Sequence, residues 1–158
     1  MAKYNCDEAW QAKTLRGGAG LVCRDDLGCF LEAGGEGGLV CQSAIIAEAL
    51  AIQEAINASW IVGFKEIVIE SDSKEIITML RKETVVGVEV ESIVFNIQTL
   101  AYRLDRVIYM HTSCSCNRTA HLVASFVSKQ RGTHFWVLVC PNWLFNCLAE
   151  DVNVFVRL

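Results

Sequence analysis

The segment Ile67-Val68-Ile69-Glu70-Ser71-Asp72-Ser73 joins a short run of β-branched residues to two carboxylates and two hydroxyls. The β-branched run predicts a strand over 65–70, and the residues after it return to a helical period. An acidic residue at the carboxyl end of a strand is where α/β proteins tend to place ligands and chemistry. Asp72 is therefore a candidate site residue. A structural alternative stays open, because the same residue can begin a helix as its N-cap, with Glu75 three positions on.

The pattern on either side of this segment predicts a mixed α/β chain. Strands are expected over 3–10, 19–24, from residue 30 onward and over 106–111, with a hairpin turn at 24–28. The glycine-rich stretch 34–38 is expected to break the third strand. Helices are expected over 43–59, 73–81, 90–104 and 117–129. This order predicts an α/β fold with a five-stranded mixed sheet, three antiparallel strands and then two parallel ones, and helices on both faces.

At 158 residues the chain has the length of one domain, and 53% of its residues are hydrophobic while only 20% are charged. Such a composition favours a substantial core over disorder. We expect the domain to span residues 1–130. Residues 131–158 are expected to form a tail that packs on the same domain, since Trp136, Trp143 and Leu148 are apolar.

The composition also limits the location and the partners of the chain. The N-terminus lacks the zones of a signal peptide, and the longest apolar run of the tail, Phe135 to Cys140, is six residues, so we expect no transmembrane segment and no membrane partner. The eight cysteines stand at ordinary strand and helix positions, which favours reduced thiols in an intracellular compartment, the cytoplasm or the nucleus. A net charge of −4 disfavours general attraction to nucleic acid, so any such binding needs a local basic patch or cations.

Two further carboxylates stand in apolar surroundings. Glu48 shares a helical face with Ile45 and Ile52, so the period directs it inward, where a carboxylate needs a proton, a hydrogen bond or a cation. It could also pair with a basic residue or lie at the edge of the apolar stripe.

Asp7 ends the alternation of the first strand and is either an acid on the sheet face or a turn residue. If the strands of Asp7 and Asp72 are neighbours, the three acids form a cluster that hard divalent cations would stabilise.

Short motifs along the chain, in this order, resemble the ribonuclease H superfamily, most closely its plant reverse-transcriptase-like branch. The residues that carry the resemblance are Asn5–Trp10 in the first strand, Gly20–Asp25 and Gly28 in the second strand and turn, Ala47-Glu48-Ala49, Glu70-Ser71-Asp72-Ser73, His111, Asn117 and Ala120–Ala124. The tail around Trp136 and Pro141–Leu144 is similar to the extension of the plant branch.

The resemblance implies a ribonuclease H-like fold and an endonuclease that hydrolyses the RNA strand of RNA/DNA hybrids. We expect the chain to be a monomer. It implies that Asp7, Glu48 and Asp72 are catalytic and bind two Mg²⁺ or Mn²⁺ ions, which activate a water for in-line attack. His111 would correspond to a histidine that assists proton transfer or product release. A histidine bound to backbone at a strand end is an equally open interpretation of His111.

Three departures from the family pattern support a second hypothesis. His121 stands where many active members have a fourth acidic ligand, so one metal site is expected to be weak. Glu8 replaces the usual glycine beside Asp7, and residues 81–89 carry only Arg81 and Lys82 in place of a basic protrusion. Low affinity for the hybrid with strong salt dependence follows. The alternative function is a ribonuclease H-fold module with weakened catalysis that binds nucleic acid or protein.

A zinc site is a competing interpretation of the C-terminal half. His111, Cys114, Cys116 and His121 offer two imidazoles and two thiols within eleven residues. The single residue between the two cysteines is poor spacing for a zinc knuckle, and the chain has no second ligand pair of that kind.

The basic residues around Arg81 and Lys129 have a simpler explanation as solvated helix ends than as a nucleic-acid patch.

Overall fold

Six strands form one mixed sheet in the order β5-β4-β1-β2-β3-β6. The structure is a computed structural model that describes the backbone of residues 1–156 and the side chains of residues 1–150. The strands are β1 (Ala2–Gln11), β2 (Arg16–Arg24), β3 (Phe30–Val40), β4 (Glu66–Ser71), β5 (Arg106–His111) and β6 (Gly132–Val137). The helices are α1 (Ala44–Val62), α2 (Lys74–Leu80), α3 (Glu91–Ala101), α4 (Arg118–Gln130) and α5 (Asn142–Val156), with 3₁₀ turns η1 (Val88–Val90) and η2 (Cys114–Cys116).

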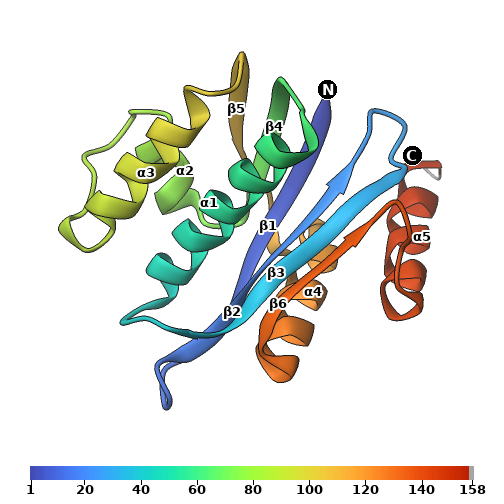
Figure 1. Cartoon of the computed structure of the whole chain (residues 1–158), viewed down its shortest axis with the longest axis horizontal. Coiled ribbons are helices and arrows are strands. Elements are labelled where there is room, and N and C mark those ends of the chain that lie inside the picture. The colour runs from blue at the N-terminus through green and yellow to red at the C-terminus, as the bar shows by residue number, and fades with distance from the viewer. Residues whose placement is uncertain (157–158) are drawn as a thin grey trace.

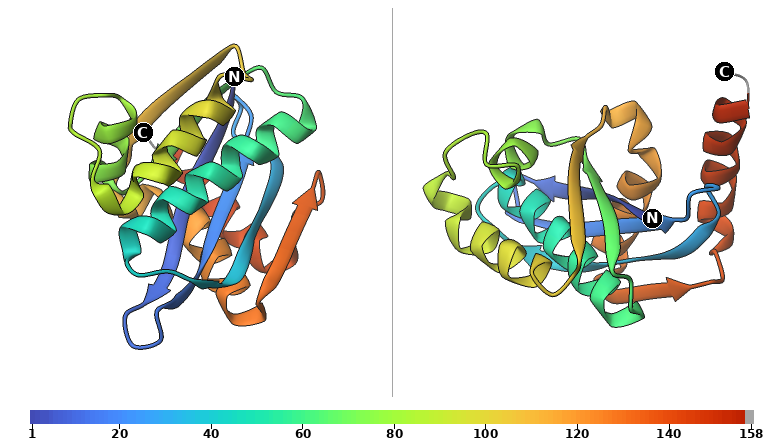
Figure 2. Two further views of the ribbon diagram at one scale, coloured as in Figure 1. Left: turned by 60° about the vertical axis from the view of Figure 1, so that its left-hand side comes forward. Right: turned by 90° about the horizontal axis from the view of Figure 1, so that it is seen from above.

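The helices cover both faces of the sheet, as predicted. Helix α1 crosses one face with α3 beside it, while α4 lies on the opposite face (Figures 1 and 2). Each face has its own hydrophobic core, and adjacent residues of β2 divide between them: Leu21 packs on the α1 side and Val22 on the α4 side. This division follows from the alternation of side chains along a strand.

The prediction of five strands was one strand short. Residues 132–137, assigned to a docked tail, form β6, which pairs antiparallel with β3 from Glu32↔Val137 to Gly37↔Gly132. Without β6, the outer edge of β3 would expose unpaired N–H and C=O groups. No local pattern in 131–137 indicates this partner, because the pairing joins segments about a hundred residues apart in the chain.

The glycine-rich stretch 34–38 does not break β3, which continues to Val40. Gly37 in this stretch and Gly20 in β2 are needed because α4 lies directly on the sheet. A Cβ added at Gly37 would lie 1.7 Å from the carbonyl oxygen of Val127, and one added at Gly20 would lie 2.4 Å from the backbone nitrogen of Ala124. Here glycine permits close helix-to-strand packing, so the prediction of a strand break was wrong.

Helix α1 is long and apolar enough to cross a membrane by length and composition alone. Half of this helix is buried within the structure, where Ile52, Ala55 and Ile56 pack against the sheet. The core helix of a soluble protein meets the same criteria, so this feature is weak evidence for a membrane span.

Candidate metal centre

The register of the two central parallel strands brings Asp7 and Asp72 together. Strands β1 and β4 pair from Ala2↔Ile67 to Cys6↔Ser71. Asp7 and Asp72 are each the next residue after this last pair. Because parallel strands end at the same edge of the sheet, the two carboxylates lie side by side where β4 stops.

Glu48 completes the cluster from α1. Its side chain is only 6% exposed, as the helical period predicted. The Ser71 hydroxyl donates a hydrogen bond of 3.1 Å to Oε2 of Glu48. One carboxylate oxygen from each of Asp7, Glu48 and Asp72 lies within 4.8 Å of the others. Three acids from two strand ends and one helix therefore form a single oxygen-lined site.

The electrostatics of the cluster suit a bound cation. Burial raises the pKa of Glu48 to about 10, and the neighbouring carboxylates of Asp7 and Asp72 contribute to the rise. Burial, followed by the charge of Asp7, also raises the pKa of Asp72. Carboxylates held this close repel one another unless protons or cations lie between them. The donor set consists of hard oxygen atoms, which are the ligands that Mg²⁺ and Mn²⁺ prefer.

Asp72 is not the cap of the helix that follows it. Helix α2 begins at Lys74 and its N-cap residue is Ser73. The backbone N–H of Ser73 donates to the Ser71 hydroxyl at 3.1 Å. The interpretation of Asp72 as the N-cap was therefore wrong, and its side chain belongs to the acidic cluster.

The two candidate histidines occupy different places around the cluster. Nδ1 of His121, in the first turn of α4, lies 3.0 Å from Oδ2 of Asp7. His111 is exposed at the end of β5, where it pairs in register with Ser71. Its charge, when protonated, lowers the pKa of Asp72, so it lies within electrostatic reach of the cluster. Neither imidazole belongs to the group of three converging oxygens.

A buried amide network holds the start of α4 against β1. Nδ2 of Asn117 donates to the carbonyl oxygen of Cys6 at 2.7 Å, and Nδ2 of Asn5 donates to Oδ1 of Asn117 at 3.1 Å. Asn5 also donates to Oε2 of Glu70 at 2.9 Å. Both asparagines are fully buried. This network sets the position of the helix turn that carries His121 beside Asp7.

Comparison with known proteins agrees with this arrangement. The model of the reverse transcriptase-like family matches residues 5–127. The chain belongs to this family. The sequence has no match among curated proteins.

The fold is ribonuclease H-like. It is similar to ribonuclease H1 from the halophilic archaeon Halobacterium salinarum, at 18% identity and a TM-score of 0.75, over 82% of this chain and 97% of that one. It is also similar to the N-terminal ribonuclease H domain of a Mycobacterium tuberculosis protein, at 17% identity and a TM-score of 0.71, over 78% of this chain and 95% of that one. A third similar structure is LC11-RNase H1 in complex with an RNA/DNA hybrid, at 17% identity and a TM-score of 0.69, over 78% of this chain and 93% of that one. At these identities the likeness concerns the fold.

A cleft of about 630 Å³ lies over the acidic cluster of this reverse transcriptase-like chain. On one side it is lined by Asp7, Glu8, Glu48 and Asp72, and on the other by residues of η2, α4 and α5. Glu8 adds a fourth carboxylate beside the three acids, and burial raises its pKa. The side that α5 contributes lies beyond residue 127, where the family match ends.

Several residues of the site escaped prediction from the sequence. Ser71 belongs to the Glu70–Ser73 motif, and its position after Ile67 and Ile69 at the strand period is the signal that directs it toward α1. No local signal indicated Arg118 or the side chains from α5, because their place in the cleft depends on how α5 docks. Besides Ser71, which binds Glu48, the cleft residues that were not predicted as site residues are Cys114, Arg118, Leu122, Trp143, Asn146, Cys147 and Glu150.

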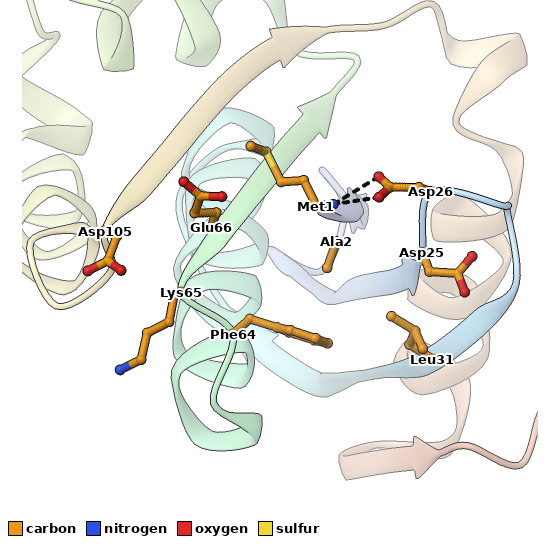
Figure 3. A pocket seen from close by; sticks show the side chains of 9 residues that line it. All are labelled: Met1, Ala2, Asp25, Asp26, Leu31, Phe64, Lys65, Glu66 and Asp105. Carbon is orange, nitrogen blue, oxygen red and sulfur yellow. Dashed lines mark hydrogen bonds and ion pairs between the residues drawn. The ribbon is translucent and has the colours of Figure 1, made fainter.

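A second cavity, of about 510 Å³, lies at the opposite end of the parallel strands. Its acidic residues Asp25, Asp26, Glu66 and Asp105 are spread around the rim and do not converge (Figure 3). Asp26 binds the N-terminal ammonium of Met1 at 2.8 Å. This cavity therefore lacks the ligand geometry of the cleft at the other end.

The zinc interpretation finds no support in the geometry. Cys114 and Cys116 are both exposed. Within the part of the chain that the structure describes, Asp7, Glu48 and Asp72 are the one group of acids, thiols and imidazoles that converges as metal ligands do. The two cysteines and two histidines do not form such a group.

Proposed function

We propose that the chain is a divalent-metal-dependent nuclease that hydrolyses the RNA strand of RNA/DNA hybrids. The observation that carries the proposal is the convergence of Asp7, Glu48 and Asp72 within 4.8 Å on a ribonuclease H-like fold. That one similar structure, LC11-RNase H1, is a complex with an RNA/DNA hybrid supports nucleic acid as the partner.

Asp7, Glu48 and Asp72 would hold two ions, Mg²⁺ or Mn²⁺. Their oxygen ligands fit such ions. Burial raises the pKa of Glu48, and the charges of Asp7 and Asp72, which cations would offset, raise it further. When bound, the ions supply charge neutralisation for the phosphodiester and activation of a water. Asp7 and Asp72 bind from the strand ends, while Ser71 orients Glu48 through its hydroxyl. One of the two sites is weaker, because His121 offers a neutral nitrogen in place of a fourth carboxylate.

The two histidines have separate roles in this proposal. His121 contacts Asp7 at 3.0 Å and holds that carboxylate in position. His111, exposed at the end of β5 beside Asp72, is placed to move a proton to or from the leaving group.

A second candidate function is a binding module with weakened catalysis. The specific observation in its favour is the crowding of Glu8 and Glu150 into a cleft that already holds three acids. A cleft of this charge repels phosphates and needs more cation neutralisation than a cleft with a basic rim. In this case the chain would bind a hybrid without efficient cleavage.

We also propose that the chain is monomeric and works in a reducing, intracellular compartment. The burial of Cys6, Cys23 and Cys41 as small apolar side chains supports the reducing environment.

The test is cleavage of a labelled RNA/DNA hybrid with Mg²⁺ or Mn²⁺, comparing the native chain with Asp72→Asn. A matched control is Asp105→Asn, which removes one carboxylate from the second cavity. We expect the native chain and the control to cleave the RNA strand, while Asp72→Asn does not. If the native chain cleaves no faster than Asp72→Asn, the enzymatic proposal fails. Binding of the hybrid without cleavage would favour the second candidate.

A further inference from the structure

Helix α5 forms the second wall of the cleft over the acidic cluster. Trp143, Asn146, Cys147 and Glu150 line the cleft from this helix. Their spacing of three, four and seven residues places them on one helix face. This wall lies in the C-terminal segment, beyond residue 127, where the family match ends.

The opposite face of α5 anchors the helix on the domain. Leu144 is fully buried and Leu148 is 7% exposed, both in the core beneath α4. The ring of Trp143 stacks on Phe126 with centroids 4.4 Å apart. The wall is therefore held by packing along α5 from Trp143 to Leu148.

An ion pair at the cleft joins α4 to α5. Nη2 of Arg118, the first residue of α4, lies 3.6 Å from Oε2 of Glu150. Both side chains are more than half exposed, at 61% and 63%. Solvent and salt screen such a pair, so a stronger anion can displace the carboxylate from the guanidinium.

The charges in the cleft show why Arg118 matters. Five carboxylates line it, from Asp7, Glu8, Glu48, Asp72 and Glu150. Among the cleft residues that the structure describes, Arg118 is the only lysine or arginine. A guanidinium presents paired N–H donors whose geometry matches two oxygens of a phosphate. The carboxylate of Glu150, at 3.6 Å, satisfies these donors less well.

We propose that Arg118 binds a backbone phosphate of the nucleic acid substrate, and that Glu150 on α5 occupies this guanidinium until the substrate displaces it. The inference rests on the proposed function, since it assumes that nucleic acid enters this cleft. Glu150 then acts as an internal competitor that weakens binding and makes affinity depend on salt.

The test measures the affinity of four chains for a fluorescein-labelled RNA/DNA hybrid by anisotropy over a range of salt concentrations. All carry Asp72→Asn so that cleavage does not interfere, and three carry in addition Glu150→Gln, Arg118→Gln or both. We expect Glu150→Gln to tighten binding about threefold, and Arg118→Gln to weaken it by a similar factor and lower the salt slope by about 1. The double variant should bind the hybrid with the same affinity as Arg118→Gln alone, because Glu150 has no guanidinium to occupy once Arg118 is replaced.

The matched control is Glu83→Gln. Glu83 pairs with Arg81 at 3.1 Å, both side chains are half exposed, and neither lines the cleft. This variant makes the same change in net charge and also breaks a surface ion pair. If Glu150→Gln tightens binding no more than Glu83→Gln does, the inference is overturned.

The outcomes separate this inference from the proposed function. A native chain that cleaves the hybrid, with equal affinities for Glu150→Gln and Glu83→Gln, overturns the role of Glu150 alone. A chain that binds the hybrid without cleaving it overturns the enzymatic proposal, while the comparison of variants still decides the role of Arg118. If none of the chains binds the hybrid, both proposals fail.

Discussion

Nδ1 of His121 lies 3.0 Å from Oδ2 of Asp7, so the residue in place of a fourth carboxylate already contacts one of the three acids. The contact depends on the close packing of α4 on Gly20, which is the residue opposite Asp7 in β2. The imidazole is 62% exposed and the carboxylate is 7% exposed. The cluster thus offers three carboxylate oxygens, with an imidazole nitrogen in contact with one of them.

Replacing His121 with Asp is expected to tighten Mg²⁺ binding, because the variant adds a hard anionic ligand next to Asp7. The same change should lower the melting temperature of the metal-free chain, since a fourth carboxylate adds repulsion. Calorimetric titration with Mg²⁺ and thermal unfolding in a chelator check the two effects. His134→Asp, in β6 and outside the cleft, controls for the added charge. Equal Mg²⁺ affinity in the native chain and His121→Asp would contradict the expected ligand role.

The raised pKa of Glu48 predicts how stability varies with pH in the absence of metal. The pKa rises from 4.5 to about 10 on folding, mainly through burial. A raised pKa means that the folded chain binds this proton more tightly, so the stabilisation is complete below the unfolded pKa and is lost as pH rises toward 10. We expect the free energy of unfolding to fall by at least about 1 kcal/mol between roughly pH 5 and pH 9.

The Glu48→Gln variant should lose most of this pH dependence, because its amide does not titrate. Denaturant unfolding in a chelator at several pH values gives the comparison. Glu66→Gln changes an exposed glutamate of β4 and should keep the native dependence. If the free energy of unfolding changes with pH equally in Glu48→Gln and in the native chain, a group other than Glu48 causes the pH dependence.

Gly37 is expected to tolerate no side chain. An added Cβ would lie 1.7 Å from the carbonyl oxygen of Val127, so α4 would have to move away from the sheet. Gly37→Ala should cost about 1–3 kcal/mol in the free energy of unfolding, the usual cost of overpacking. Gly87→Ala is the control, because its Cβ would meet only Cε of Met79 at 3.6 Å and its φ is −67°. Equal stability of the two variants in denaturant unfolding would argue against the close packing of α4.

Leu144 tests whether the C-terminal segment is an integral part of the domain. Its side chain is fully buried between α4 and the sheet, so Leu144→Ala should cost about 2–5 kcal/mol and leave a cavity. The neighbouring Phe145 is 61% exposed, and Phe145→Ala should change stability little. In denaturant unfolding we expect each variant to show a single cooperative transition, with Leu144→Ala less stable than Phe145→Ala. A Leu144→Ala chain as stable as Phe145→Ala would mean that α5 does not dock as described.

Much of the candidate site could be predicted from local patterns. Helical period directed Glu48 inward, and strand-end position marked Asp72, because both signals depend on residues within two turns or one strand. Asp7 was ambiguous from its own surroundings. Only the register of β1 against β4 places it beside Asp72.

The sequence by itself determined the order of the first five strands and four helices, the core face of α1, the inward direction of Glu48 and the strand-end position of Asp72. These features depend on side-chain period and on chemistry that the residues carry in any fold. The tertiary structure alone decided the sixth strand, the continuation of β3 through its glycines and the wall that α5 adds to the cleft. Each of these depends on contacts between distant segments, such as β6 on β3 or α4 on Gly37, for which the local pattern holds no signal.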